Sequence, residues 1–341
     1  MFSPIREGAA QYRANLHCHS TLSDGKLTPE QLKDAYRKEG YAILAITDHE
    51  RPRSHSELSE KDFLLLTGYE AYMRPGTQCK YSLYQPELHC NLIAEEPDNV
   101  RYVCYEEPYC KYVKDPAERE AFEKVGTTGH REYTPAYINQ FVREANENGY
   151  LCLYNHPVWS MEDEETILQY RGFVSMEMCN YSAHQTIGAE YNLALYNRLL
   201  RGGMRIACHG ADDNHNEYPI GTPGSDSFGS YTMILADELT YPAVIRALKN
   251  GDFYASMGPR ILSLSIADGK AQIRTSGAIA IRMFWNTLKK SEAVYGAADA
   301  PVCEATFSIP ADAAFVQFSV TDAQGNHADT RGYFRDEFEK I

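Results

Sequence analysis

Two histidines and an aspartate near the N-terminus have the types and the spacing of metal ligands. His17 and His19 are two residues apart within residues 15–25, and Asp24 follows them in a Ser-Asp-Gly turn. In an extended stretch the two imidazoles point to the same side, because strand side chains repeat with a period of two. Neutral imidazole is the commonest metal ligand, and carboxylate oxygen binds the same divalent ions. Taken alone, this stretch is equally consistent with two hydrogen-bonded histidines at a strand end.

Further side chains of the same chemistry lie in or directly after short apolar runs along the chain. With the first three they make a set of nine: His17, His19, Asp24, His49, Glu70, His89, His156, Asp213 and His215. Nine such ligands exceed the capacity of one Zn²⁺, which takes about four. The sequence therefore predicts a centre of two or three divalent ions that share a bridging carboxylate.

Helix-like segments separate these apolar runs. Residues 28–39 begin with a capping box and a proline at the first helical position, and residues 134–148 also begin with Thr-Pro. Two more helices are expected near 190–201 and 240–249. Repeated strand–helix units with acids and histidines at the strand ends are typical of a parallel α/β barrel whose site lies on that face. About seven strands are expected.

The pattern changes near residue 259. Runs at 261–266, 278–285 and 315–320 look like short strands beside turn sequences, without helical segments between them. We therefore expect two domains: a metal-dependent barrel over residues 1–258 and a small antiparallel β-domain, similar to a sandwich, over 259–341. No metal ligand is expected from the second domain.

Residues 95–133 are rich in tyrosine and charged side chains and show no clear period. They are expected to form an inserted excursion over the surface near the mouth of the site.

The charge, the cysteines and the apolar runs of the sequence limit the classes of binding partner and the cellular location that we expect. The formal net charge of −14 over 341 residues argues against a grip on long nucleic acid, which needs clustered Lys and Arg. The nine cysteines are an odd number without CxxC spacing and are expected to be reduced thiols. The sequence has no apolar leader and no apolar run of membrane-spanning length, so a cytoplasmic protein without membrane contact is expected.

The ordered motifs His-x-His with Ser-Asp-Gly, Thr-Asp-His, Gly-x-Glu, His-x-Asn, Asn-His-Pro and Asp-x-His resemble the PHP (polymerase and histidinol phosphatase) superfamily over residues 13–258. The resemblance implies a distorted (β/α)7 barrel that carries two to three divalent ions such as Zn, Mn or Fe. It also divides the ligands into three groups: His17, His19, Glu70 and Asp213; Glu70, His89 and His156; and Asp24, His49 and His215.

The activity implied by this resemblance is that of a metal-dependent phosphoesterase acting on a small phosphorylated metabolite. A metal-bridging hydroxide would attack phosphorus, with Glu70 and Asp213 as the catalytic carboxylates. Two alternatives remain open: hydrolysis of a carboxylic ester or amide by the same centre, and a non-enzymatic binding module.

Two stretches depart from the family pattern: residues 50–53 after Thr-Asp-His, and the insertion at 95–133. Four basic side chains are weaker candidates for substrate binding, namely Arg51, His130, Arg131 and His184. Asp48 is expected to orient His49 or its neighbourhood, and Glu177 could either face the site or have a structural role.

Overall fold

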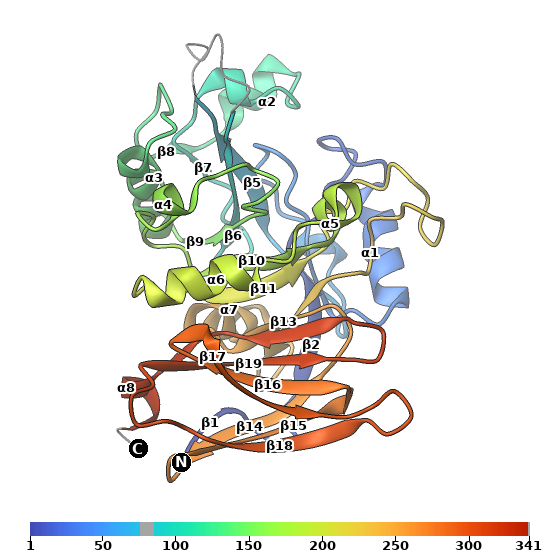
Figure 1. The fold of residues 1–341 in the computed structure, drawn as a ribbon. Coiled ribbons are helices and arrows are strands. Elements are labelled where there is room, and N and C mark those ends of the chain that lie inside the picture. The colour runs from blue at the N-terminus through green and yellow to red at the C-terminus, as the bar shows by residue number, and fades with distance from the viewer. Residues whose placement is uncertain (76–84, 340–341) are drawn as a thin grey trace.

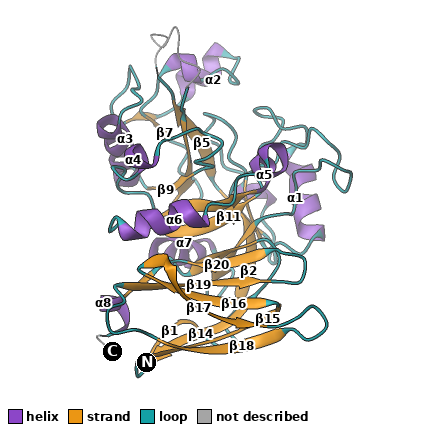
Figure 2. Cartoon of the chain, in the orientation of Figure 1, coloured by secondary structure: helices purple, strands orange, loops and turns teal. Residues whose placement is uncertain are grey.

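The computed structural model describes residues 1–75 and 85–339 and confirms a mixed α/β fold (Figures 1 and 2). The strands that precede residue 258 are β1 (Phe2–Ile5), β2 (Gln11–Asn15), β3 (Ile43–Ala45), β4 (Leu64–Leu66), β5 (Gly68–Met73), β6 (Leu88–Ala94), β7 (Tyr102–Val103), β8 (Lys124–Val125), β9 (Tyr150–Tyr154), β10 (Ser175–Asn180), β11 (Ala207–Ala211), β12 (Tyr231–Leu235) and β13 (Phe253–Ser256). The helices in the same part are α1 (Pro29–Lys38), α2 (Pro116–Ala121), α3 (Pro135–Glu147), α4 (Glu164–Ile167), α5 (Tyr181–Ile187), α6 (Leu193–Arg201) and α7 (Tyr241–Asn250), with short 3-10 turns η1 (Ser56–Leu58) and η2 (Glu107–Tyr109).

The four predicted helices are confirmed as α1, α3, α6 and α7, and their ends follow the local sequence signals. Thr28 caps α1 in a capping box with Gln31, and Thr134 caps α3. Gly251 ends α7 in the left-handed region at φ 72°, which glycine adopts at little cost.

The remaining elements are β14 (Ile261–Ala267), β15 (Lys270–Ala278), β16 (Ala280–Trp285), β17 (Thr287–Tyr295), β18 (Val302–Ser308), β19 (Phe315–Thr321), β20 (His327–Thr330), β21 (Tyr333–Phe334) and α8 (Arg335–Phe338). All strand pairs among them are antiparallel, as predicted. They are joined to the rest of the chain, because β1 pairs with β14 and β13 pairs with β20. Figure 1 shows both termini at this end of the molecule. The domain division at residue 258 stays a prediction.

The strands of the first part are not all parallel, which corrects the expectation from the sequence. β2, β3 and β4 are parallel, and so are β9, β10 and β11. However, β6 runs antiparallel to both β5 and β9, and β12 runs antiparallel to β2 and β13. The hydrogen-bonded orders of the described strands are open: β11-β10-β9-β6-β5 in one sheet, and β17-β16-β19-β20-β13-β12-β2-β3-β4 in the other. A closed (β/α)7 barrel is therefore not confirmed.

The insertion carries the short elements β7, η2, α2 and β8 and is held by buried side chains. β7 and β8 pair in parallel, and Tyr102 and Val103 of β7 are buried. Val103 belongs to the apolar cluster that packs β5, β6, β9 and β10 against α3 and α6, together with Leu92 and Phe141. The insertion is therefore packed against the core of the first part.

The eight cysteines that the structure describes are free thiols, and of these only Cys303 is exposed. This agrees with the reduced state expected for them, which stays a prediction, and Cys79 lies outside the described residues. Among the helices of the described chain, none combines the length and the apolar character needed to span a membrane.

Candidate metal centre

The structure brings all nine predicted ligands into one connected cluster. His17 and His19 follow β2, and Asp213 and His215 follow β11. Asp213 donates its backbone N–H to the carbonyl of His17 at 2.9 Å, and His19 donates its own to the carbonyl of Asn214 at 3.1 Å. These two bonds hold two turns side by side that are almost 200 residues apart in the sequence.

Glu70, on β5, lies at the centre of the cluster and is 1% exposed. Its Oε1 is 3.2 Å from Nε2 of His17, 3.1 Å from Nδ1 of His89 and 3.4 Å from Nε2 of His156. Its Oε2 is 2.8 Å from Nδ1 of His49. The two oxygens thus face different imidazoles, an arrangement in which one carboxylate can bridge two cations.

Asp213 forms a second group with the first two histidines. Its Oδ1 is 3.1 Å from Nε2 of His17 and 3.0 Å from Nε2 of His19. Its backbone lies in the left-handed region at φ 53°, which aspartate adopts more readily than most side chains. Asn180 donates from Nδ2 to Oδ2 of Asp213 at 3.0 Å, so the carboxylate is held with Oδ1 toward the imidazoles.

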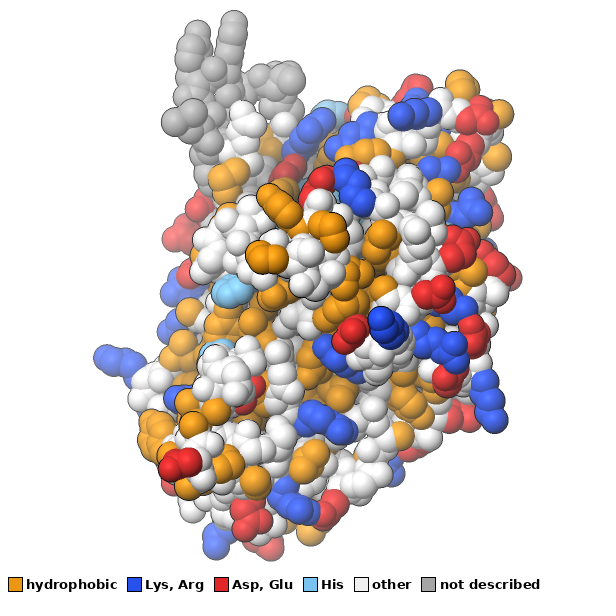
Figure 3. Space-filling model, turned by 90° about the vertical axis from the view of Figure 1, so that its right-hand side faces the viewer, with side chains coloured by type: hydrophobic (Ala, Val, Ile, Leu, Met, Phe, Trp, Pro, Cys, Tyr) orange, Lys and Arg blue, Asp and Glu red, His pale blue; other side chains and the backbone are white. Residues whose placement is uncertain are grey.

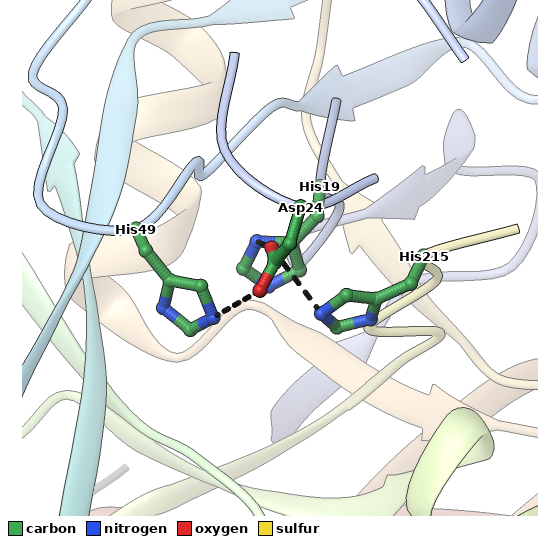
Figure 4. Close-up of side chains that lie close together, drawn as sticks. All are labelled: His19, Asp24, His49 and His215. Atoms are coloured by element: carbon green, nitrogen blue, oxygen red, sulfur yellow. Dashed lines mark ion pairs between the residues drawn. The ribbon is translucent and has the colours of Figure 1, made fainter. Parts of the chain in front are cut away.

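Asp24 forms an outer group with three histidines, whose side chains converge on it in Figure 4. Its Oδ2 is 3.5 Å from Nε2 of His49, and its Oδ1 is 3.6 Å from Nε2 of His215 and 3.7 Å from Nδ1 of His19. The next residue must be glycine, because a Cβ on Gly25 would lie 2.1 Å from the carbonyl oxygen of His19. This close approach is the physical reason for the glycine in the Ser-Asp-Gly turn.

The cluster suits divalent cations. Four of its buried atoms have no hydrogen-bond partner within the described part of the chain: Asp24 Oδ1, His49 Nδ1, Glu70 Oε2 and Asp213 Oδ1. A buried polar atom without a partner costs about 1–3 kcal/mol, and a cation facing several such atoms would remove that cost. Imidazole with carboxylate is a donor set that Zn²⁺, Mn²⁺ and Fe²⁺ accept.

Glu70 and His19 are in the protonation states that bind metal. Burial alone would raise the pKa of Glu70, but the imidazoles of His17, His89 and His49 outweigh it and hold that pKa well below the usual value. Burial, and then neighbouring imidazoles, lower the pKa of His19 to about 4. At neutral pH the carboxylate is therefore ionised and the imidazole is neutral, the forms in which both bind metal. Against the effect of burial, neighbouring carboxylates raise the pKa of His17, His89 and His156, so these three imidazoles would release a proton on binding a cation.

Three further buried side chains orient the ligands. Glu177, on β10, accepts a hydrogen bond from His17 Nδ1 at 2.8 Å and another from the backbone N–H of His156 at 2.7 Å. Asn155 donates from Nδ2 to Oε1 of Glu70 at 2.7 Å, and Asn180 bonds to Glu177 as well as to Asp213. Sequence reasoning leaves the role of Glu177 open and assigns none to the two asparagines. Their signal is weak: each follows or ends a strand, as the ligands do.

Asp48 supports the ligands next to His49, in agreement with its expected role. Its carboxylate accepts from the backbone N–H of Ser20 at 2.8 Å and from the hydroxyls of Ser20 and Ser23 at 2.6 Å. It therefore fixes the turn between His19 and Asp24.

Arg131 is in the core, which corrects its expected contact with substrate. The side chain is fully buried, and it donates to both carboxylate oxygens of Glu50 and to the carbonyls of Tyr72, Val103 and Cys104. All five of its N–H groups are used inside the protein, so none is left for a ligand.

The other three basic candidates also lie outside the cluster of described metal-ligating side chains. Arg51 donates to both oxygens of Glu118 at 2.7 and 2.9 Å. The side chain of His130 is 74% exposed, and His184 lies on α5. A role of these three in substrate binding stays a prediction.

Three of the solved structures similar to this chain share little sequence with it. A two-domain protein from Bacteroides vulgatus containing a predicted PHP-like metal-dependent phosphoesterase is 16% identical, with a TM-score of 0.46 over 96% of this chain and 98% of that chain. A candidate metal-dependent phosphoesterase from Bifidobacterium adolescentis is 15% identical, with a TM-score of 0.38 over 63% and 92%. An amidohydrolase from Chromobacterium violaceum, with bound sulfate and no metal, is 15% identical, with a TM-score of 0.41 over 70% and 96%.

At TM-scores below 0.5 these three likenesses add nothing to the assignment. No curated protein matched the chain. Residues 15–187, about half of the chain, match the PHP domain family, and that range contains seven of the nine clustered ligands. The chain therefore belongs to the PHP domain family.

Proposed function

We propose that this protein is a metal-dependent hydrolase that cleaves phosphate esters of small metabolites. The observation that carries the proposal is the convergence of six imidazoles and three carboxylates on one buried cluster with unpartnered ligand atoms. Two to three cations fit this number of ligands, since one Zn²⁺ takes about four. Zn, Mn and Fe are the ions we propose.

The close groups in the structure support a particular division of the ligands. His17, His19 and Asp213 form one group, and Glu70 with His89 and His156 forms another around Oε1. The outer group contains Asp24, His49 and His215, and His19 also lies within it. His17, His19 and His49 each lie close to at least two of the three carboxylates, so the contacts do not fix the allocation of these three ligands.

When bound, divalent cations in such a cluster polarise a phosphoryl oxygen and lower the pKa of water. The protein's own groups hold the geometry: Glu177 orients His17, and Asn155 and Asn180 orient the two carboxylates. In the proposed reaction water attacks phosphorus, the ester P–O bond breaks, and the leaving alkoxide takes up a proton and departs as the alcohol. Asp213 is a proposed ligand, so we propose that its carboxylate would bind a cation and would also relay the proton of the attacking water to the leaving group.

A compact substrate agrees with the charge of the protein. The formal net charge is −14, and on the face shown in Figure 3 Lys and Arg side chains are interspersed with Asp and Glu. A small phosphorylated substrate would depend on the cations for its charge complementarity.

The experiment is a screen of small phosphate esters, including nucleotides and histidinol phosphate, with the metal-loaded protein and its Asp213→Asn variant. We expect turnover of at least one ester and a loss of about 10²- to 10⁴-fold in the variant, as for removal of a general base. Lys290→Ala, which removes an exposed ion pair with Asp312, is the control and should keep full activity. A screen without turnover of any phosphate ester would overturn the proposal.

A further inference from the structure

The two stretches that depart from the family pattern are bonded to each other. We define the cap segment as residues 102–131, the part of the insertion from β7 to Arg131. Glu50, directly after the ligand His49, forms a buried ion pair with Arg131 of the cap segment. The hydroxyl of Tyr102, also in the cap segment, donates to Oε2 of Glu50 at 2.5 Å. The cap segment is therefore attached beside a ligand of the proposed metal centre.

A second attachment lies one residue further on. Arg51 donates from one nitrogen to both oxygens of Glu118 on α2, at 2.7 and 2.9 Å, and from another to the carbonyl of Leu22 at 2.9 Å. Leu22 belongs to the turn that carries Asp24. Arg51 thus ties the cap segment to the same turn that supplies the outer carboxylate.

Between these attachments the cap segment reaches the outer ligand group. The hydroxyl of Tyr112 donates to Oδ2 of Asp24 at 2.6 Å. Its ring stacks on the imidazole of His49, with centroids 5.8 Å apart and planes 14° from parallel. Tyr112 therefore contacts two of the proposed ligands directly.

We propose that Tyr112 is a positioning residue for the cation held by Asp24, His49 and His215, and that the cap segment exists to deliver it. This inference rests on the proposed metal-dependent function. Tyr112 fixes one oxygen of the carboxylate, while the other oxygen, Oδ1, has no hydrogen-bond partner among the described residues and lies 3.6 Å from Nε2 of His215.

The hydrogen bond matters because Asp24 is the least enclosed acid of the cluster. Its side chain is 29% exposed, whereas that of Glu70 is 1% exposed and that of Asp213 is 13% exposed. A partly exposed carboxylate has freedom to rotate, and a donor on one oxygen restricts that freedom. Partners of this kind commonly change metal affinity by about 10- to 100-fold when they are removed.

The test is calorimetric titration of the metal-free protein with Mn²⁺ alone. Tyr112→Phe keeps the ring that stacks on His49 and removes only the hydroxyl. We expect one class of Mn²⁺ site to weaken by about 10- to 100-fold, with the other classes unchanged. Tyr105→Phe is the matched control, because Tyr105 lies in the same cap segment and its ring contacts Tyr102 and Lys124 instead of the cluster.

A double-mutant cycle with Asp24→Asn separates positioning from a general structural effect. If Tyr112 acts through Asp24, adding Tyr112→Phe to Asp24→Asn should cause no further loss of Mn²⁺ affinity. Equal losses in both backgrounds, or wild-type affinity in Tyr112→Phe, would overturn the inference while leaving the proposed function standing. Failure of the unaltered protein to bind Mn²⁺, Zn²⁺ or Fe²⁺ would instead overturn the proposed function and this inference with it.

Discussion

Oε1 of Glu177 lies 2.8 Å from Nδ1 of His17, and both side chains are fully buried. The bond turns the other ring nitrogen, Nε2, toward Glu70 and Asp213. Glu177→Gln keeps the size of the side chain and removes its charge, so metal affinity should fall by about 10- to 100-fold. Competition with a chromogenic chelator measures this. Glu162→Gln is the control, because Glu162 accepts hydrogen bonds from tyrosine hydroxyls and, within the described chain, from no ligand of the cluster. An equal loss of metal affinity in both variants would contradict the account.

Breaking the buried pair of the cap segment should destabilise the protein. Arg131→Met leaves the carboxylate of Glu50 buried without its partner, which typically costs about 3–5 kcal/mol. Urea unfolding measures the loss. Arg101→Ala is the matched control in the same insertion: it removes an exposed pair with Glu123, worth about 0–1 kcal/mol. Equal unfolding free energies for Arg131→Met and the unaltered protein would show that the pair is not needed for stability.

The ligand set was predictable because each ligand sits in a short motif beside an apolar run, and strand ends bring such motifs together. His17 and Asp213 illustrate this, because each can be recognised as a candidate ligand from its own short motif. Strand direction was not predictable in the same way. β5 and β6 pair antiparallel, and this pairing depends on the whole sheet and has no short signal in the sequence of either strand.

The partners of the insertion could not be read from the sequence for a different reason. Glu50 and Arg131 are 81 residues apart, and neither lies in a periodic element. An arginine near a proposed phosphate site suggests substrate binding. Arg131 is buried and therefore cannot contact a substrate, and this burial is known only from the folded chain. The same holds for the bond from Tyr112 to Asp24, which spans 88 residues.

Asp329, on β20, should make stability depend on pH. Burial raises its pKa to about 6 from 3.8, against hydrogen bonds from Ser319 and Tyr191 that lower it. The folded state therefore keeps a proton that the unfolded chain has lost, and this contribution to stability is lost as the pH rises from about 4 to about 6. Two pKa units correspond to about 3 kcal/mol.

The check on Asp329 is urea unfolding of the unaltered protein and Asp329→Asn at pH 4 and pH 7. From pH 4 to pH 7, the unfolding free energy of the variant should rise by about 3 kcal/mol relative to that of the unaltered protein. Other titrating groups are common to both proteins and cancel in the difference. A difference in unfolding free energy that does not change with pH would rule out the raised pKa.

Substitution of a histidine in the cluster should lower the metal content, and substitution of a histidine outside it should not. His17→Ala removes a ligand close to both Glu70 and Asp213, so we expect it to lose at least one equivalent of bound metal. His130→Ala should keep the full content, because its side chain is 74% exposed and outside the cluster. Elemental analysis of both purified variants measures this, and equal metal content in the two would place the metal elsewhere.

The central claim is that the centre acts on phosphorus, and two substrates with the same leaving group test it most directly. The measurement is the initial rate of p-nitrophenol release from p-nitrophenyl phosphate and from p-nitrophenyl acetate, by one metal-loaded preparation before and after chelation. The account predicts release from the phosphate that is lost on chelation and restored by adding metal back. Release from the acetate alone, with the same dependence on metal, would contradict it and favour a carboxylic-ester hydrolase.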